Sequence, residues 1–294
     1  MAKSRKSVGK TIGRLILALV GLLVLAIVVI AVRYLVWKPD PMTAFYRGQS
    51  LLVMGHRGAP EAAPENTVSS FQAAMELGAH GIEMDVMLSK DDYIVVIHDY
   101  DLDKTTDGTG PVKEHTLEQL KALDAGSWFS EKFAGEQIPL LEEVIESLDD
   151  TALLNIEIKS MSPTTDGLEK AVVTVIQEYN LYDRVMVSSF NPISLIRVKL
   201  ADKRIPVGLI YSADLPAFLS DGWFIPLLRP EALHPQFEMV DEEYMAWARK
   251  KGYRVNVWTV NEEQDIRRMI ELGVDGIITD RPDLVRQIME EQNL

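Results

Sequence analysis

Apolar residues follow two patterns along this chain, one at its start and one in the rest. Residues 15–32 form an uncharged apolar run of 18 residues, close to the ~20 that a helix needs to cross the hydrocarbon core of a bilayer. From Leu51 onward, short apolar runs typical of buried strands alternate with amphipathic segments typical of helices. These patterns predict one membrane-spanning helix followed by a single α/β domain.

The alternation occurs eight times. Strands are predicted at 51–55, 81–86, 153–158, 185–189, 206–211, 232–235, 254–259 and 275–279, and helices at 66–77, 140–148, 167–179, 192–201, 241–251, 262–272 and 282–291. Only the interval after the fifth strand is poorly helical. Eight strand and helix units in about 240 residues suit a (β/α)8 barrel, the TIM-barrel fold.

One extra strand is predicted beside the second barrel strand. Residues 90–92 read as a turn, so Tyr93 to His98 should return antiparallel to residues 81–86 and bring His98 close to Glu83 and Asp85. The Gly-, Asp- and Thr-rich stretch that follows, 100–137, contains one short predicted helix near 116–123. The sequence therefore predicts a small insertion after the second strand.

Charge is distributed unevenly along the chain. Residues 1–38 hold seven Lys or Arg and no Asp or Glu, although the whole chain has a net charge of −14. The acidic remainder should repel nucleic acid, and a phosphate-bearing ligand would need a metal ion and a few placed cations. The chain has no cysteine, which excludes disulfides and thiolate metal sites.

The charges also predict an orientation in the membrane. Five basic residues precede the apolar run and two closely follow it. By the positive-inside rule, 1–14 is a basic cytoplasmic tail, 15–37 a transmembrane helix, 38–50 a short linker, and 51–294 a barrel outside the cytoplasm. A cleaved signal peptide is the alternative, but the apolar run is longer than the usual ~7–15 residues and no clear A-x-A site follows.

Acidic residues at strand ends are the first candidate chemistry. Glu83 and Asp85 are two apart on one strand and so point to the same face, and Glu157 at the end of the next barrel strand can supply a third carboxylate. Three oxygen ligands suit one divalent cation, Mg²⁺ or Ca²⁺, and suit Zn²⁺ poorly. The alternative is that these acids form ordinary salt bridges.

Several short motifs occur together in a fixed order. His56-Arg57-Gly58, then Pro64-Glu65-Asn66-Thr67, then Glu83-x-Asp85, then His98-Asp99, resemble the glycerophosphodiester phosphodiesterase family. Later stretches, 155–159, 188–190, 257–261 and 276–280, match as well, so the resemblance runs from about Leu51 to the C-terminus. It implies a TIM barrel whose 100–137 insertion lies over the mouth. It also implies metal-dependent hydrolysis of a glycerophosphodiester to glycerol phosphate and an alcohol such as choline or ethanolamine.

The resemblance implies that His56 and His98 are the two candidates for catalytic base and acid. His98 is the preferred acid for the leaving group, although the sequence does not determine which histidine has which role. Arg57 and Lys159 are expected to bind the phosphate oxygens, unless they only pair with the metal carboxylates. By contrast, the three other histidines, His80, His115 and His234, are predicted to be structural.

Four further residues are expected around the site. Phe190 and Trp258 should wall the substrate pocket, unless they only pack in the barrel core. Asn66 is a plausible N-cap for the first barrel helix. The resemblance gives Glu65 a polar role in positioning the first histidine or the metal.

Two other functions remain open. One is lysophospholipase D activity, the same chemistry on a lipid that retains one acyl chain, and the other is a non-catalytic barrel that binds phospholipid headgroups. The membrane anchor and the apolar residues 223–228 favour lysophospholipase D activity somewhat. Residues 223–228 are predicted to form either a lip that contacts an acyl chain or the bilayer, or core packing in place of a fifth helix. The sequence does not predict the oligomeric state.

Overall fold

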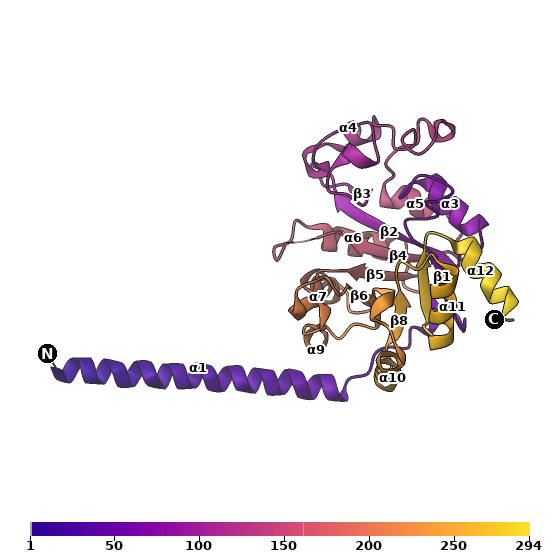
Figure 1. Ribbon diagram of the computed structural model, residues 1–294. Coiled ribbons are helices and arrows are strands. Elements are labelled where there is room, and N and C mark those ends of the chain that lie inside the picture. The colour runs from indigo at the N-terminus through magenta and orange to yellow at the C-terminus, as the bar shows by residue number, and fades with distance from the viewer. Residues whose placement is uncertain (1, 161) are drawn as a thin grey trace.

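The computed structural model describes residues 2–160 and 162–294, with side chains from residue 12 onward. A long helix, α1 (Ala2–Val36), extends from a barrel domain (Figure 1). Within α1, Ile12–Val36 is long and apolar enough to cross a membrane, and its most apolar stretch is not buried against the rest of the chain. A membrane span and a signal sequence both have these properties.

Eight parallel strands form the closed barrel that the sequence predicts. They are β1 (Leu52–Gly55), β2 (Gly81–Leu88), β4 (Leu153–Ile158), β5 (Val185–Ser189), β6 (Val207–Tyr211), β7 (Ala232–Pro235), β8 (Arg254–Val257) and β9 (Gly276–Thr279). The sheet order is β1-β9-β8-β7-β6-β5-β4-β2, and pairing of β1 with β2 closes it. Each predicted strand agrees with the structure to within two residues at either end.

Seven predicted helices cover the barrel. They are α3 (Val68–Glu76), α5 (Leu141–Ser147), α6 (Leu168–Glu178), α7 (Pro192–Ala201), α10 (Glu242–Lys251), α11 (Glu263–Leu272) and α12 (Pro282–Glu291). Local signals set their ends: in α10, for example, Asp241 accepts a hydrogen bond from the Tyr244 amide, and Gly252 ends the helix at a φ of 93°. After β6, two single turns, α8 (Ala217–Ser220) and α9 (Ile225–Leu228), replace a full helix.

Strand β3 (Ile94–Val96) pairs antiparallel with β2, as predicted from the turn at 90–92. The insertion that follows contains α4 (Leu117–Lys121) and three short 3₁₀ turns (Leu102–Lys104, Val112–Glu114, Glu131–Phe133). Its buried side chains, Leu102, Val112, Leu120 and Ala125, pack with Met87, Val95 and Ile97 into a separate apolar cluster. This packing attaches the insertion, at the top of Figure 1, to the strands that carry site residues.

The segment predicted as a linker, 38–50, is partly folded onto the barrel. It contains α2 (Thr43–Tyr46), and Met42, Phe45 and Tyr46 are buried against side chains at the starts of the strands. The Tyr46 hydroxyl also donates a hydrogen bond to Asn256 Oδ1 at 2.8 Å. The apolar side chains of this segment cover the amino end of the barrel. The prolines and polar residues of 38–50 do not by themselves predict such packing.

The end of α1 is held against the domain. Lys251 Nζ donates to the backbone carbonyls of Tyr34 and Trp37, the latter at 2.6 Å, and the Arg229 guanidinium lies 5.9 Å from the Trp37 ring centre. Arg229 ends α9, so α1 leaves the domain beside α9. In Figure 1, α1 runs toward the side on which the carboxyl ends of the barrel strands open.

Candidate active site

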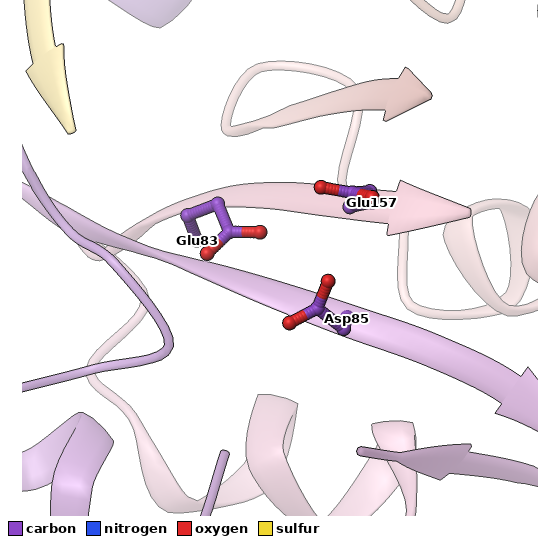
Figure 2. Close-up of side chains that lie close together, drawn as sticks. All are labelled: Glu83, Asp85 and Glu157. Carbon is purple, nitrogen blue, oxygen red and sulfur yellow. The ribbon is translucent and has the colours of Figure 1, made fainter. Parts of the chain in front are cut away.

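Three carboxylates meet at the carboxyl end of neighbouring strands. Glu83 and Asp85 lie on β2 and Glu157 on β4, where Asp85 is in register with Glu157. All three are buried, and one oxygen from each lies within 4.8 Å of the others. Figure 2 shows the three carboxylates close together on these two neighbouring strands. The structure therefore brings together the cluster that the residue spacing predicts.

Two cations lie among these carboxylates. The Lys159 ammonium is 3.4 Å from Asp85 Oδ1 and 3.2 Å from Glu157 Oε1, and Arg57 Nε is 3.5 Å from Asp85 Oδ2. The backbone N–H of Arg57 donates to Glu83 Oε2 at 2.9 Å. The ion pairs considered as the alternative role for Arg57 and Lys159 are thus present. They also place both cations at the edge of the carboxylate cluster.

The cluster has more negative than positive groups. Burial and the two neighbouring carboxylates raise the pKa of Glu83 well above its usual value, and burial with Asp85 raises the pKa of Glu157 to about 7. Although burial opposes it, Lys159 and Arg57 lower the pKa of Asp85 to about 2. Three hard oxygen donors that oppose one another's ionisation fit a divalent cation such as Mg²⁺ or Ca²⁺, whose charge would offset the repulsion between the carboxylates.

His56 directly follows β1, and its ring is oriented by a carboxylate outside the three-residue cluster. Its Nδ1 lies 2.7 Å from Asp280 Oδ1, and Asp280 Oδ2 accepts from Asn261 Nδ2 at 2.6 Å. Although burial opposes it, the hydrogen bond to His56 lowers the pKa of Asp280. No role was predicted for Asn261 or Asp280, although both lie in stretches that match the family. The position of Asp280 directly after β9, and of Asn261 four residues after the end of β8, was the signal that could have identified them.

His98 lies two residues after the end of β3, and its ring also bonds a carboxylate through Nδ1. Its Nδ1 lies 2.6 Å from Asp99 Oδ1, and burial lowers the pKa of His98. His56 and His98 both line a cavity of about 100 Å³ that also contains Glu83 and Glu157. Because each carboxylate occupies an Nδ1 atom, the Nε2 atom of each ring is left for a bound molecule.

One predicted local role is wrong. Asn66 is not the N-cap of α3: the cap is Thr67, whose hydroxyl accepts from the Ser70 amide. Asn66 instead has a left-handed φ of 58°, and its side chain donates to Asp85 Oδ2 at 2.9 Å while accepting from the Asp85 amide at 3.2 Å. It therefore orients a candidate metal ligand directly, a long-range contact that local helix rules do not detect.

Glu65 pairs with Arg57 instead of with the first histidine. Its Oε1 accepts from Arg57 Nη1 at 2.9 Å and lies 3.6 Å from Lys104 Nζ. The left-handed φ of Arg57, 52°, turns its guanidinium toward both Glu65 and Asp85. Glu65 thus reaches the site through Arg57.

Two aromatic side chains wall the catalytic cavity on the side of β5 and β8. Phe190 and Trp258 follow these strands, line the cavity, and pack edge to face with ring centres 5.4 Å apart. The Trp258 indole N–H donates to the His234 carbonyl at 2.7 Å. The rings are half-buried, so they both complete the barrel wall and face the cavity.

The three histidines predicted to be structural each have a local partner. His80 Nδ1 accepts from the Val53 amide at 3.0 Å, and His115 Nδ1 bonds the Pro111 carbonyl at 2.9 Å. His234 is fully buried beneath the cavity, with Nε2 3.0 Å from Asn256 Nδ2. Burial lowers the pKa of His234 to about 3, so it remains neutral.

Residues 223–228 are divided between buried and exposed side chains. Ile225 and Leu228 are buried in the barrel's own core, as the packing interpretation predicts. Trp223 and Leu227 are 68% and 51% exposed, as a lip would be.

Comparison with known proteins agrees with this geometry. Residues 56–284 match the model of the glycerophosphoryl diester phosphodiesterase family. A glycerophosphodiester phosphodiesterase of Caldanaerobacter subterraneus subsp. tengcongensis is 45% identical over 242 residues, which cover 82% of this chain and 98% of the relative. A second glycerophosphodiester phosphodiesterase, from Bacillus subtilis, is 32% identical. The match covers 90% of this chain and 97% of the Bacillus protein.

Solved structures show the same relationship. A phosphodiesterase of Oleispira antarctica, in complex with the product sn-glycerol-3-phosphate, has a TM-score of 0.71 at 32% identity, covering 81% of this chain and 96% of that one. A putative glycerophosphoryl diester phosphodiesterase of Silicibacter pomeroyi has a TM-score of 0.75 at 27% identity. The match covers 86% of this chain and 98% of that one. These neighbours share the barrel.

Proposed function

Since the chain belongs to the glycerophosphoryl diester phosphodiesterase family, we propose that it hydrolyses glycerophosphodiesters to glycerol phosphate and an alcohol. The observation that carries the proposal is the placement of two imidazoles and the carboxylates of Glu83 and Glu157 around one cavity, with Asp85 within 4.8 Å of both carboxylates. In the balanced reaction, the P–O bond to the alcohol breaks, the oxygen of water ends on phosphorus, and a proton ends on the alcohol oxygen. The product named for the Oleispira antarctica relative, sn-glycerol-3-phosphate, is the product this reaction yields.

We propose that Glu83, Asp85 and Glu157 hold one divalent cation, Mg²⁺ or Ca²⁺. Such an ion supplies Lewis-acid chemistry, which reduces the negative charge that a phosphodiester presents to a nucleophile. Arg57 and Lys159 then bind the remaining phosphate oxygens, since each is already within 3.5 Å of the carboxylates at the cavity edge. Asn66 and Glu65 position Asp85 and Arg57, respectively.

The two histidines act as base and acid. A carboxylate that accepts from Nδ1–H directs Nε2 toward the cavity, as a lone pair when the ring is neutral and as an N–H donor when the ring is protonated. We assign His56 as the base that removes a proton from the nucleophile, which is water or the substrate's own glycerol hydroxyl. His98 is the acid that protonates the leaving alcohol. Tyr100, two residues after it in the chain, lines a larger cavity of about 770 Å³ with room for that alcohol.

An activity assay with two leaving groups tests these roles. His56→Ala and His98→Ala should each lower turnover of glycerophosphocholine by ~10²–10⁴-fold, whereas His115→Ala, in the insertion, should change it little. A p-nitrophenyl ester needs no proton on its leaving group. It should therefore restore activity to the His98 variant and leave the His56 variant inactive. Equal restoration in both variants, or in neither, would contradict the assignment.

We also propose that residues 15–37 are an uncleaved membrane span with residues 1–14 in the cytoplasm and the catalytic barrel, 51–294, outside it. The support is the exposed apolar helix Ile12–Val36 and the excess of basic residues before it. Protease added to intact spheroplasts should digest the barrel. Protection of the barrel until the membrane is permeabilised would reverse the orientation.

A further inference from the structure

An apolar groove lies next to the catalytic cavity. It has a volume of about 470 Å³ and lies between the ends of β4 and β5, the start of α7, and the α8–α9 segment. The side chains that line it include Phe190, Ile193, Leu215, Phe218, Leu219 and Phe224. The lining of this groove is mostly apolar, unlike that of the polar cavity that holds the carboxylates and histidines.

The groove is continuous with the catalytic cavity. Phe190 lines both, and Ser160, which directly follows Lys159, lines the groove while Lys159 lines the cavity. A molecule whose phosphate is bound at Lys159 can therefore extend past Phe190 into the groove. Any substrate group placed there meets almost only hydrocarbon.

The groove also faces the proposed bilayer. Its outer wall is formed by the α8–α9 segment, where Phe218 is 44% exposed and packs near Phe224, with ring centres 6.5 Å apart. The same segment carries exposed Trp223 and Leu227 and ends at Arg229, which contacts Trp37 at the end of α1. In Figure 1 the membrane helix leaves beside α9 toward the side on which the barrel opens, so this wall lies at the level where α1 enters lipid.

We propose that the groove binds the acyl chain of a lysophospholipid that enters from the bilayer beside α1. The proposal rests on the phosphodiesterase function above and names its substrate class. A monoacyl glycerophosphodiester has the phosphate that the catalytic cavity binds and one hydrocarbon chain on its glycerol side, and in this proposal that chain extends past Phe190 into the groove. The reaction is unchanged: water cleaves the P–O bond to the headgroup alcohol, and the acylated glycerol phosphate is the other product.

A series of substrates that differ only in chain length tests the groove. The full chain in lipid nanodiscs is assayed on glycerophosphocholine and on short-chain monoacyl glycerophosphocholines that remain soluble below their micelle concentration. The specificity constant kcat/KM should rise by up to about fourfold for each methylene group that the groove buries. Above the length that fills the groove, the rise should stop.

Two variants separate the groove from general membrane effects. Phe218→Asp places a charge on the groove wall, and Leu200→Asp places one at a site that is 82% exposed at the end of α7 and outside the groove. The ratio of kcat/KM for the longest soluble acyl substrate to that for glycerophosphocholine should fall at least tenfold in Phe218→Asp. It should change less than twofold in Leu200→Asp.

The outcomes distinguish the two proposals. If glycerophosphocholine is hydrolysed but kcat/KM does not depend on chain length, the groove proposal is wrong and the phosphodiesterase function stands. A chain-length dependence that Phe218→Asp leaves intact also overturns it, because the chain then binds elsewhere. If neither substrate is hydrolysed, the proposed function itself fails.

Discussion

Replacing Asp280 by Asn should invert the proton position on His56. Asp280 accepts from His56 Nδ1 with one oxygen, at 2.7 Å, and from Asn261 Nδ2 with the other, at 2.6 Å. The orientation of Asn261 is itself set, since its Oδ1 accepts from the Asp280 amide at 2.9 Å and from the Thr279 hydroxyl at 3.1 Å. In Asp280→Asn, the new side-chain amide must therefore present its oxygen to Asn261 and its NH₂ group to His56.

An NH₂ group facing Nδ1 forces the His56 proton onto Nε2, so the lone pair needed in the cavity is lost. The alternative amide orientation places two donors against each other at Asn261 and costs about 1–3 kcal/mol. We expect kcat/KM for glycerophosphocholine to fall by ~10²–10⁴, the usual contribution of a general base. Nitrogen NMR of labelled histidine should show the changed tautomer directly.

A second substitution should reverse much of this loss. In Asp280→Asn with Asn261→Asp, the new carboxylate at position 261 can accept from the NH₂ group at position 280, which leaves the side-chain oxygen at position 280 to accept from His56 Nδ1. The double variant should still be less active than wild type, because His56 then bonds a neutral amide oxygen in place of a charged carboxylate. This difference costs about 1 kcal/mol or somewhat more, which lowers kcat/KM roughly tenfold. Activity of the single variant within threefold of wild type, or a double variant no better than the single, would refute this reasoning.

Three other predictions follow from the structure. Mg²⁺ or Ca²⁺ at a hundred times its Kd should raise the free energy of unfolding by about 2.7 kcal/mol in wild type and in Glu263→Gln, an exposed control, but by much less in Glu157→Gln, as measured by denaturant titration. Phe45→Ala, which opens the amino end of the barrel, should lower the free energy of unfolding by about 3–5 kcal/mol while the folded fraction keeps its kcat. Asp99→Asn should slow hydrolysis of glycerophosphocholine far more than that of a p-nitrophenyl ester, because it disturbs only the acid His98; equal effects on both esters would contradict this.

Much of the architecture could be predicted from local pattern. Each barrel strand is a short apolar run, and each long helix has an apolar face, so their order alone indicates a closed parallel barrel. The carboxylates of Glu83 and Asp85 were also predictable, because residues two apart on a strand share a face. Register between β2 and β4 then placed Glu157 beside them.

Contacts between distant parts of the chain were not predictable in the same way. His56 and Asp280 are 224 positions apart and meet only because β1 pairs with β9 when the barrel closes. Asn66 reads as a helix cap locally, but its side chain bonds to Asp85 instead. Segment 38–50 reads as a linker, yet Phe45 and Tyr46 cover the barrel end, since only the folded barrel offers an apolar surface there.

Phosphorus NMR of glycerophosphocholine incubated with the purified full chain measures metal-dependent hydrolysis of a glycerophosphodiester at this cavity. Glycerol phosphate should accumulate as the diester signal declines, should cease to form when a chelator is added, and should form again when Mg²⁺ or Ca²⁺ is restored. An unchanged diester signal, or hydrolysis that the chelator does not affect, would contradict the account.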